Sequence, residues 1–360
     1  MKNEYICESS IIIKAIIANR FGKNWAFRAI TVSTLFLFIF IAPTGVIFTA
    51  DAQTALKEIS FIPQWSPQAQ FAGYYAAYEQ GIYRKHGLNV RIIQGGAYKP
   101  SSEILEKGEA DIASIWLSTA IQKRSRKIKL VDIGQIVQRS SLMLIAKKSQ
   151  GIKTPEDLNG KKIGLWGADF RIQPEAFFKK HNIKVKVIPQ SYSVNLFLRD
   201  GVDAASAMWY NEYHTILNAG INADELTSFF YSDYGLNFPE DGLYVMEDVL
   251  KKDPEAICAF VRASIEGWKY AFDHPDEALD IILRYMVAAN VPANRVHQKW
   301  MLERMKDIIY PSGKDGTAVP GTLRKEDYDR VAGELKEAGL IRDIPDINAF
   351  VFRCEGNVQK

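Results

Sequence analysis

The chain has 360 residues, of which 47% are hydrophobic and 24% are charged, so it can bury a large core. This length predicts two domains or lobes once any targeting segment is removed. The formal net charge is only +3, which gives no electrostatic basis for binding nucleic acid, and we expect no nucleic-acid partner.

A targeting segment is predicted at the N-terminus. Basic residues precede an uncharged stretch that runs from Ala29 to Ala50. The small-x-small pattern that signal peptidase recognises, Ala-Asp-Ala, then ends at Ala52. We therefore expect residues 1–52 to be a signal peptide, cleaved before Gln53, and the protein to be exported. The alternative is an uncleaved membrane tether, since the stretch is barely long enough to span a bilayer.

Strand and helix signals alternate beyond this segment. Short apolar runs predict strands or extended segments at 59–63, 89–96, 110–116, 130–137 and 141–148. Between them, helices are predicted up to Gly81, from Pro100 to Lys107, and on to about Arg126. This βα repeat predicts an α/β fold with a mostly parallel sheet that is covered by helices on both faces.

A second βα set begins at Thr154, a helix-capping residue that is followed by Pro155. It has predicted strands at 161–167, 185–189 and 203–209. The pattern then changes to long amphipathic helices, from Asp253 to Phe272 and from Pro275 to about Ala288.

One internal echo links the two sets. GEADIASIW at 108–116 resembles GVDAASAMW at 201–209, and each would form the end of a βα unit. The echo predicts two similar α/β lobes with equivalent strand ends.

Ligands of open α/β sheets bind beyond the carboxyl ends of the strands, so this rule collects one set of residues from each predicted lobe. The first-lobe set is Trp65, Gln68, Gln70, Gly95, Gly96, Trp116 and Ser118. The second-lobe set is Trp166, Gly167, Phe170, Trp209, Tyr210, Asn211 and Glu212. Aromatic rings and amides with one carboxylate suit a flat, polar, largely uncharged ring better than a phosphate or a metal.

Two roles are open to the aromatic residues, packing in the core and ligand binding. Most of an aromatic stripe with i, i+3, i+4, i+7 spacing is expected in the core, and its members are Phe71, Tyr74, Tyr75 and Tyr78. Trp65 precedes that stripe, which leaves it open to either role. Trp116 and Trp209 end apolar strands, where burial explains them as well as ligand contact does.

The remaining reactive side chains predict no chemistry. Cys258 lies on the first long helix, where we expect a buried thiol, with a disulfide to Cys354 as the alternative in an oxidising compartment. The five histidines show no metal-ligand spacing, and nucleophile, phosphate-loop and CxxC motifs are absent from the sequence. We expect no metal, no cofactor and no catalytic residue.

The basic run at 123–129 is expected to be a solvated helix end, with docking to a partner as the alternative.

Several motifs resemble one family of binding proteins. WSPQAQFAGYY from Trp65, GKKIGLWG at 160–167, YNEY at 210–213 and DYGLNFPEDGLYV at 233–245 look like those of the thiamine-pyrimidine-precursor binders of ABC transporters. These are related to the sulfonate and taurine binders, and the resemblance covers nearly all of the chain beyond residue 52.

The resemblance implies a two-lobed periplasmic-binding-protein fold of type II, with lobe one at 55–147 and 239–350 and lobe two at 148–238. It implies a periplasmic monomer that closes on a small-molecule ligand and delivers it to an ABC permease. Trp65 would stack on a pyrimidine ring, and Glu212 would accept a hydrogen bond from its amino group. The expected ligand-binding residues are Trp65, Gln68, Gly96, Trp116, Ser118, Trp166, Tyr210, Asn211, Glu212 and Tyr234.

The same family contains the fungal thiamine pyrimidine synthase, which is an enzyme. That branch resembles W-x-P-N-x-x-H with a cysteine-rich cluster, whereas this chain has Gln68 and Phe71 at the Asn and His places and no such cluster. A phenylalanine has no nitrogen to donate or coordinate, so we expect binding without catalysis. Riboflavin or another aromatic heterocycle is the alternative ligand. An alkylsulfonate comes third, because the collected set contains no arginine and Arg139 and Arg171 are the only nearby candidates.

Overall fold

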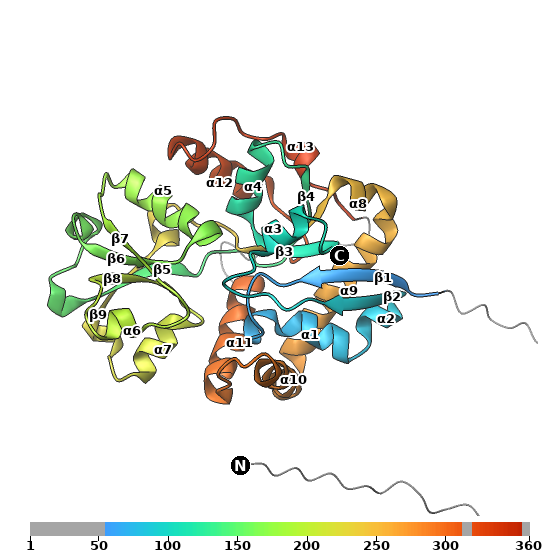
Figure 1. Ribbon diagram of the computed structural model, residues 1–360, viewed down its shortest axis with the longest axis horizontal. Coiled ribbons are helices and arrows are strands. Elements are labelled where there is room, and N and C mark those ends of the chain that lie inside the picture. Colours follow the sequence, from blue (N-terminus) through green and yellow to red (C-terminus); the bar gives the residue numbers. More distant parts are fainter. Residues whose placement is uncertain (1–54, 312–318, 355–360) are drawn as a thin grey trace, which may run out of the picture. The chain divides into compact units, whose positions relative to one another are not determined.

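The computed structural model describes residues 55–311 and 319–354, and the expected signal peptide and its cleavage site lie outside them. Two five-stranded sheets organise the described residues (Figure 1). The first has the order β2-β1-β3-β10-β4 and is built from β1 (Lys57–Ile62), β2 (Leu88–Ile92), β3 (Ile112–Trp116), β4 (Leu130–Gln135) and β10 (Asp241–Met246). The second has the order β7-β6-β8-β5-β9 and is built from β5 (Leu142–Lys147), β6 (Lys162–Leu165), β7 (Lys186–Pro189), β8 (Ala204–Met208) and β9 (Leu226–Phe230).

The two sheets share one topology. β1 pairs in parallel with β2 and β3, and β6 does so with β7 and β8. One antiparallel strand is inserted in each sheet, β10 in the first and β5 in the second. β3 and β8 therefore occupy equivalent places, which confirms the equivalence that the sequence echo predicted.

The chain crosses between the lobes twice, between β4 and β5 and between β9 and β10. β5 pairs with β8 and β9, so the expected end of the first lobe at residue 147 is wrong and the crossing lies at 136–141. The error has a physical cause, because an apolar run shows that a strand forms but not which sheet it joins. The second crossing lies at 231–240.

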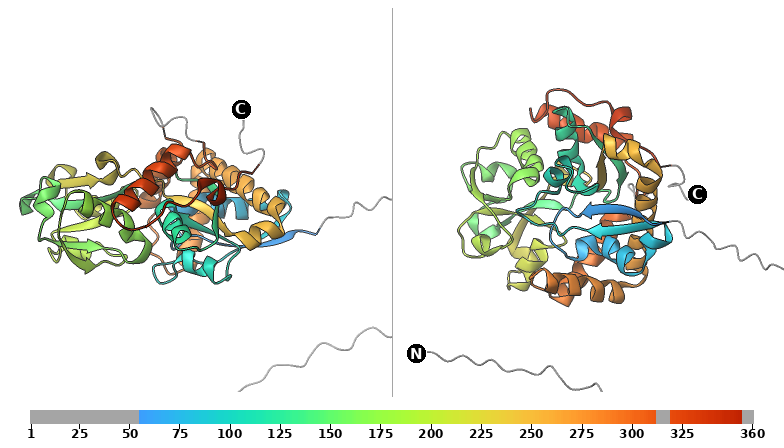
Figure 2. Two further views of the ribbon diagram at one scale, coloured as in Figure 1. Left: turned by 90° about the horizontal axis from the view of Figure 1, so that it is seen from above. Right: turned by 45° about the vertical axis from the view of Figure 1, so that its right-hand side comes forward.

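Helices cover both faces of each sheet (Figures 1 and 2). In Figure 1, α5 lies above the second sheet, with α6 and α7 below it. The shorter helices are α2 (Ile82–Lys85), α3 (Ser101–Glu106), α4 (Leu117–Ser125), α5 (Ile172–Lys180), α6 (Asn195–Leu198), α7 (Glu212–Asn218), α8 (Glu247–Lys252) and α13 (Ile347–Phe350). The longer ones are α9 (Pro254–Asp273), α10 (Pro275–Ala288), α11 (Arg295–Ile309) and α12 (Lys325–Glu337). Among the described residues, no helix has both the length and the apolar character that crossing a bilayer requires.

The central strands are buried on both faces, as strands between two helical layers must be. Alternate residues of β5 consequently enter different hydrophobic clusters. Leu142 and Leu144 join the main core, whereas Met143 and Ile145 join a smaller cluster on the other face of the second sheet.

The aromatic stripe builds the first βα unit, in the 3-10 turn η1 (Ala69–Phe71) and in α1 (Ala72–Glu79). Phe71, Tyr74 and Tyr75 are buried and Tyr78 is 42% exposed, which confirms that most of the stripe lies in the core. α1 approaches α9 closely enough that a Cβ on Gly73 would lie 2.3 Å from the ring of Trp268. A glycine is therefore required at this helix crossing.

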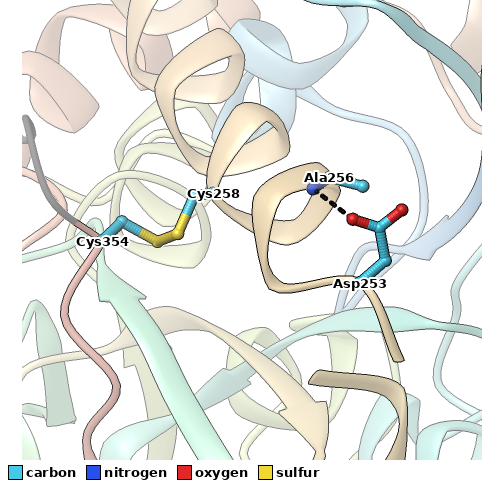
Figure 3. Close-up of a disulfide and its surroundings, with 4 residues drawn as sticks. All are labelled: Asp253, Ala256, Cys258 and Cys354. Carbon is cyan, nitrogen blue, oxygen red and sulfur yellow. Dashed lines mark hydrogen bonds between the residues drawn. A yellow bond between two sulfur atoms is a disulfide. The ribbon is translucent and has the colours of Figure 1, made fainter. Parts of the chain in front are cut away.

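The helix α9 begins where its sequence predicts, and a disulfide also anchors it. Pro254 occupies its first turn, and the Asp253 carboxylate accepts a hydrogen bond from the Ala256 amide at 3.0 Å (Figure 3). Cys258 forms a disulfide with Cys354, so the expected free thiol is wrong (Figure 3). The disulfide is the alternative that the sequence left open, and local patterns could not decide it because the two cysteines are 96 residues apart. The bond ties the C-terminal segment to α9.

Candidate ligand-binding site

An aromatic cluster lies where the two lobes meet. Trp65 follows β1 and Trp116 ends β3 in the first lobe, while Trp166 and Phe170 follow β6 in the second. The Phe170 ring packs edge-to-face against all three indoles, with centroid distances of 5.3 Å to Trp65, 4.8 Å to Trp116 and 6.0 Å to Trp166. The carboxyl ends of strands from both sheets thus present aromatic faces to one space.

Two cavities adjoin this cluster. The inner cavity, of about 30 Å³, is lined by Gln64, Trp65, Gln68, Gln70, Trp116, Trp166, Phe170, Met208, Tyr210, Asn211 and Glu212. The outer cavity, of about 330 Å³, is lined by Gln64, Trp65, Gly96, Ala97, Tyr98, Pro100, Ser101, Trp166, Gly167, Asp169, Phe170, Pro189, Gln190 and Ser191. The inner space holds little more than water, so a heterocycle needs Phe170 or the lobes to move. The outer cavity lies within the size range of small-molecule sites.

Neither cavity is lined by a lysine, an arginine or a histidine, and the acidic side chains are Glu212 and Asp169. Glu212 is 7% exposed, and burial raises the pKa of its carboxyl group to about 7. Asp169 accepts a hydrogen bond from the Ser102 hydroxyl at 2.8 Å, and burial raises the pKa of its carboxyl group as well. The linings can therefore accept hydrogen bonds and stack rings, but they offer no cation for an anionic ligand.

Glu212 is positioned by its neighbours in the chain. It opens α7, where its Oε2 accepts from the Met208 amide at 3.0 Å and its Oε1 accepts from Asn211 Nδ2 at 2.8 Å. An ionised carboxylate has about four acceptor sites, so both oxygens can accept further hydrogen bonds.

Asn211 is in turn held from the first lobe. Its Oδ1 lies 2.8 Å from His297 Nε2 on α11, which must donate because Asn211 Nδ2 already faces Glu212. His297 Nδ1 lies 2.8 Å from His214 Nδ1 on α7, and the His214 ring stacks on Trp300 at 4.7 Å. This histidine cluster, consisting of His214, His297 and Trp300, bridges the lobes and orients the site carboxylate through Asn211.

Other contacts cross between the lobes around the cavities. The Tyr192 hydroxyl accepts from the Ala97 amide at 2.8 Å, and its ring lies 5.0 Å from that of Trp65. On another flank, Lys180 pairs with Glu334 at 2.7 Å. The structure therefore shows the lobes in contact about the site.

The structure gathers most of the predicted site residues. Those that line the inner cavity are Trp65, Gln68, Trp116, Trp166, Tyr210, Asn211 and Glu212. Gly96 lines the outer cavity. Ser118 is buried on α4 and lines neither cavity, and Tyr234 packs instead against Phe177 and His181 in the second lobe. Arg139 and Arg171 also line neither.

Several cavity residues were not predicted from the sequence. In the inner cavity they are Gln64 and Met208, and Gln64 also lines the outer cavity. The outer cavity adds Ala97, Tyr98, Pro100, Ser101, Asp169, Pro189, Gln190 and Ser191. Gln64 comes directly before Trp65 and Met208 ends β8, so the strand-end rule could have collected both. Asp169 lies one residue before Phe170, but sequence gives no sign that burial, rather than solvent, surrounds its carboxylate.

Comparisons with known proteins agree on the fold and the family. Residues 68–278 match the family described as NMT1/THI5 like. The chain is 23% identical to the formylaminopyrimidine-binding protein of Halalkalibacterium halodurans, over 81% of this chain and 89% of that one. It is 24% identical to the riboflavin-binding protein RibY of Chloroflexus aurantiacus, over 79% of this chain and 84% of that one.

An enzyme is also among the similar proteins. The 4-amino-5-hydroxymethyl-2-methylpyrimidine phosphate synthase of Aspergillus parasiticus is 21% identical, over 66% of this chain and 73% of that one.

Among solved structures, the periplasmic aliphatic sulphonate binding protein SsuA from Escherichia coli has a TM-score of 0.61 at 15% identity, over 81% of this chain and 96% of that one. This likeness establishes the two-lobed periplasmic-binding-protein fold.

Proposed function

The chain belongs to the NMT1/THI5-like family, and we propose that it is the solute-binding protein of an ABC importer and captures a thiamine-precursor-like aminopyrimidine between its lobes. The observation that carries this proposal is the pair of aromatic, cation-free cavities at the facing strand ends of the two lobes. A flat heterocycle gains stacking on such faces beyond the burial of its area.

The polar groups of the site favour an amino-substituted ring. Glu212 is the carboxylate of the inner cavity, and its ionised oxygens accept from a ligand N–H group. A sulfonate would instead meet two acidic side chains and no cation among the lining residues, which disfavours it. The formylaminopyrimidine-binding relative supports a pyrimidine.

Riboflavin is the second candidate, supported by the riboflavin-binding relative and by the five aromatic side chains that line the inner cavity. Its larger ring system would require the inner and outer cavities to merge. Gln64, Trp65, Trp166 and Phe170 line both cavities, so movement of Phe170 would join them.

We propose binding without turnover. Phe71, at the place of the synthase histidine, is buried in the core and lines neither cavity. It therefore offers no group for catalysis at this site. The synthase relative keeps an enzymatic role as the outcome to be tested against.

Export to the periplasm, with an ABC permease as the partner, is part of the proposal. The disulfide supports it, because such bonds persist in oxidising compartments. Mass spectrometry of protein from its native host should find Gln53 as the first residue. Intact residues 1–52 in a membrane fraction would instead indicate a tether.

The test is a panel of ligands: formylaminopyrimidine, 4-amino-5-hydroxymethyl-2-methylpyrimidine, riboflavin and an alkylsulfonate. The aminopyrimidines should raise the Tm, since a ligand that binds only the folded state stabilises it by about 2.7 kcal/mol at 100 times its Kd. Chromatography should recover them unchanged. A Tm rise with riboflavin or the sulfonate alone would favour that ligand, and conversion proportional to protein would favour an enzyme.

A further inference from the structure

Gln64 is a buried amide without a partner at the wall between the two cavities. Its residue is 4% exposed, and it lines both the inner and the outer cavity. Neither Nε2 nor Oε1 of its side chain has a hydrogen-bond partner among the described residues. A buried amide left in this state destabilises the folded protein, so it calls for an explanation.

The other buried glutamines differ from Gln64 in this respect. Each of the remaining six in the described ranges makes at least one side-chain hydrogen bond: Gln68, Gln70, Gln135, Gln138, Gln173 and Gln298. Gln135 and Gln138 leave only their Oε1 atoms without a partner, whereas Gln64 leaves both of its side-chain polar atoms without one. Among these buried glutamines, the fully unpartnered amide is therefore the one that lines both cavities.

The backbone around Gln64 is nonetheless held in place. Its amide donates to the Ser114 hydroxyl on β3 at 2.8 Å. The neighbouring segment passes so close to Gly95 that a Cβ there would lie 2.2 Å from the Pro63 carbonyl oxygen and 2.6 Å from that of Trp65. A fixed backbone with an open amide is the arrangement that recognition of a ligand requires.

We propose that Gln64 recognises the ligand by donating one hydrogen bond to it and accepting another from it. This role rests on the proposed function and narrows the ligand class of the site. A carboxamide offers an N–H and a C=O side by side, and it matches a ring nitrogen next to an amino group, as glutamine matches the edge of adenine. The class is thus an uncharged heterocycle with adjacent acceptor and amino donor.

Gln64 and Glu212 can share one amino group because that group carries two hydrogens. Glu212 accepts one hydrogen, while Gln64 accepts the other and donates to the adjacent ring nitrogen. Gln64 follows β1 in the first lobe and Glu212 opens α7 in the second. The ligand would therefore connect the lobes through a single edge, which couples its recognition to closure.

The test combines two proteins with two ligands in titration calorimetry. The proteins are wild type and Gln64→Met, which keeps the length of the side chain and removes both polar groups. The ligands are 2-methyl-4-aminopyrimidine and its analogue 3-methylaniline, which has C–H in place of both ring nitrogens and, like the pyrimidine, is largely uncharged at neutral pH. Wild type should bind the analogue about tenfold or more weakly, since a bidentate pair gives discrimination of this order. Gln64→Met should bind both ligands with nearly equal, weak affinity.

Thermal melts of the ligand-free proteins provide the second readout. Gln64→Met should keep or raise the Tm, because it removes a buried amide that had no partner. The control Gln298→Met should lower it, because Gln298 accepts from the Ala69 amide at 2.7 Å.

The outcomes separate the two ideas. Equal discrimination between the ligands by wild type and Gln64→Met would overturn the role of Gln64 while leaving the proposed function standing. A lower Tm for ligand-free Gln64→Met, like that of the control, would assign Gln64 to folding instead. Failure of wild type to bind 2-methyl-4-aminopyrimidine would overturn the proposed function and this ligand class with it.

Discussion

Replacing Glu212 by glutamine tests the electrostatic part of the site most directly. The change removes the charge and keeps the size of the side chain. In the variant, the Met208 amide can still donate to the remaining side-chain oxygen. The new amide nitrogen then faces Asn211 Nδ2, which in wild type donates to the carboxylate at 2.8 Å. Asn211 cannot flip freely, because its Oδ1 lies 2.8 Å from His297 Nε2.

The expected loss of affinity follows from the hydrogen bond to the ligand. A bond to a charged group contributes roughly 1.5–3 kcal/mol, so Glu212→Gln should weaken aminopyrimidine binding by about tenfold or more. Because burial raises the pKa of Glu212 to about 7, wild-type affinity should increase as the pH rises through about 7. The variant should lack this pH dependence.

The stability of the ligand-free protein should change in the opposite sense. Burial raises the folded-state pKa of Glu212 from 4.5 to about 7, so its contribution to stability is full below 4.5 and is lost as the pH rises through 7. This linkage amounts to about 3 kcal/mol. The Tm of Glu212→Gln relative to wild type should therefore rise between about pH 5 and about pH 8.

Titration calorimetry and thermal melts of both proteins across this pH range decide the matter. Comparing the variant with wild type at each pH cancels the titration of other groups. Unchanged affinity together with parallel pH profiles would show that Glu212 does not contact the ligand in its ionised form, and would refute the reasoning.

Three further predictions concern stacking, the disulfide and the histidine cluster. Trp65→Ala should weaken ligand binding about tenfold while the ligand-free protein stays folded, because Trp65 is only partly buried; unfolding of the variant with unchanged affinity of its folded fraction would make Trp65 a core residue. Cys354→Ser should lower the free energy of unfolding by about 4–5 kcal/mol in urea, because the lost bond to Cys258 closes a span of 96 residues, and reductant should destabilise wild type equally; a difference below about 1 kcal/mol would contradict this estimate. His297→Leu should weaken binding severalfold through Asn211, with circular dichroism still native. Burial and the charge of His214 lower the pKa of His297 from 6.5 to about 4, so its contribution to stability is present above 6.5 and is lost as the pH falls through 4. The acid-unfolding profile of His297→Leu should therefore differ from that of wild type, and an identical profile would exclude this contribution to stability.

The sequence by itself was enough for the local elements. Asp253 and Pro254 begin α9, and Thr154 caps a 3-10 turn at Pro155–Leu158, because caps depend on residues a few positions apart. The echo between 108–116 and 201–209 also located the equivalent strands β3 and β8. With the rule that ligands bind at strand ends, this local information gathered most of the residues around the inner cavity.

The tertiary structure decided everything that depends on partners distant in the chain. β5 joins the second sheet through β8 and β9, and Cys258 pairs with a residue 96 positions away. The same holds for the electrostatics of the site. Burial of Glu212 and the open amide of Gln64 arise where two lobes meet, and the cost of an unsatisfied or charged group depends on the atoms around it. A sequence specifies which groups are present, but only long-range packing sets their environment, and with it their pKa values and free hydrogen-bonding capacity.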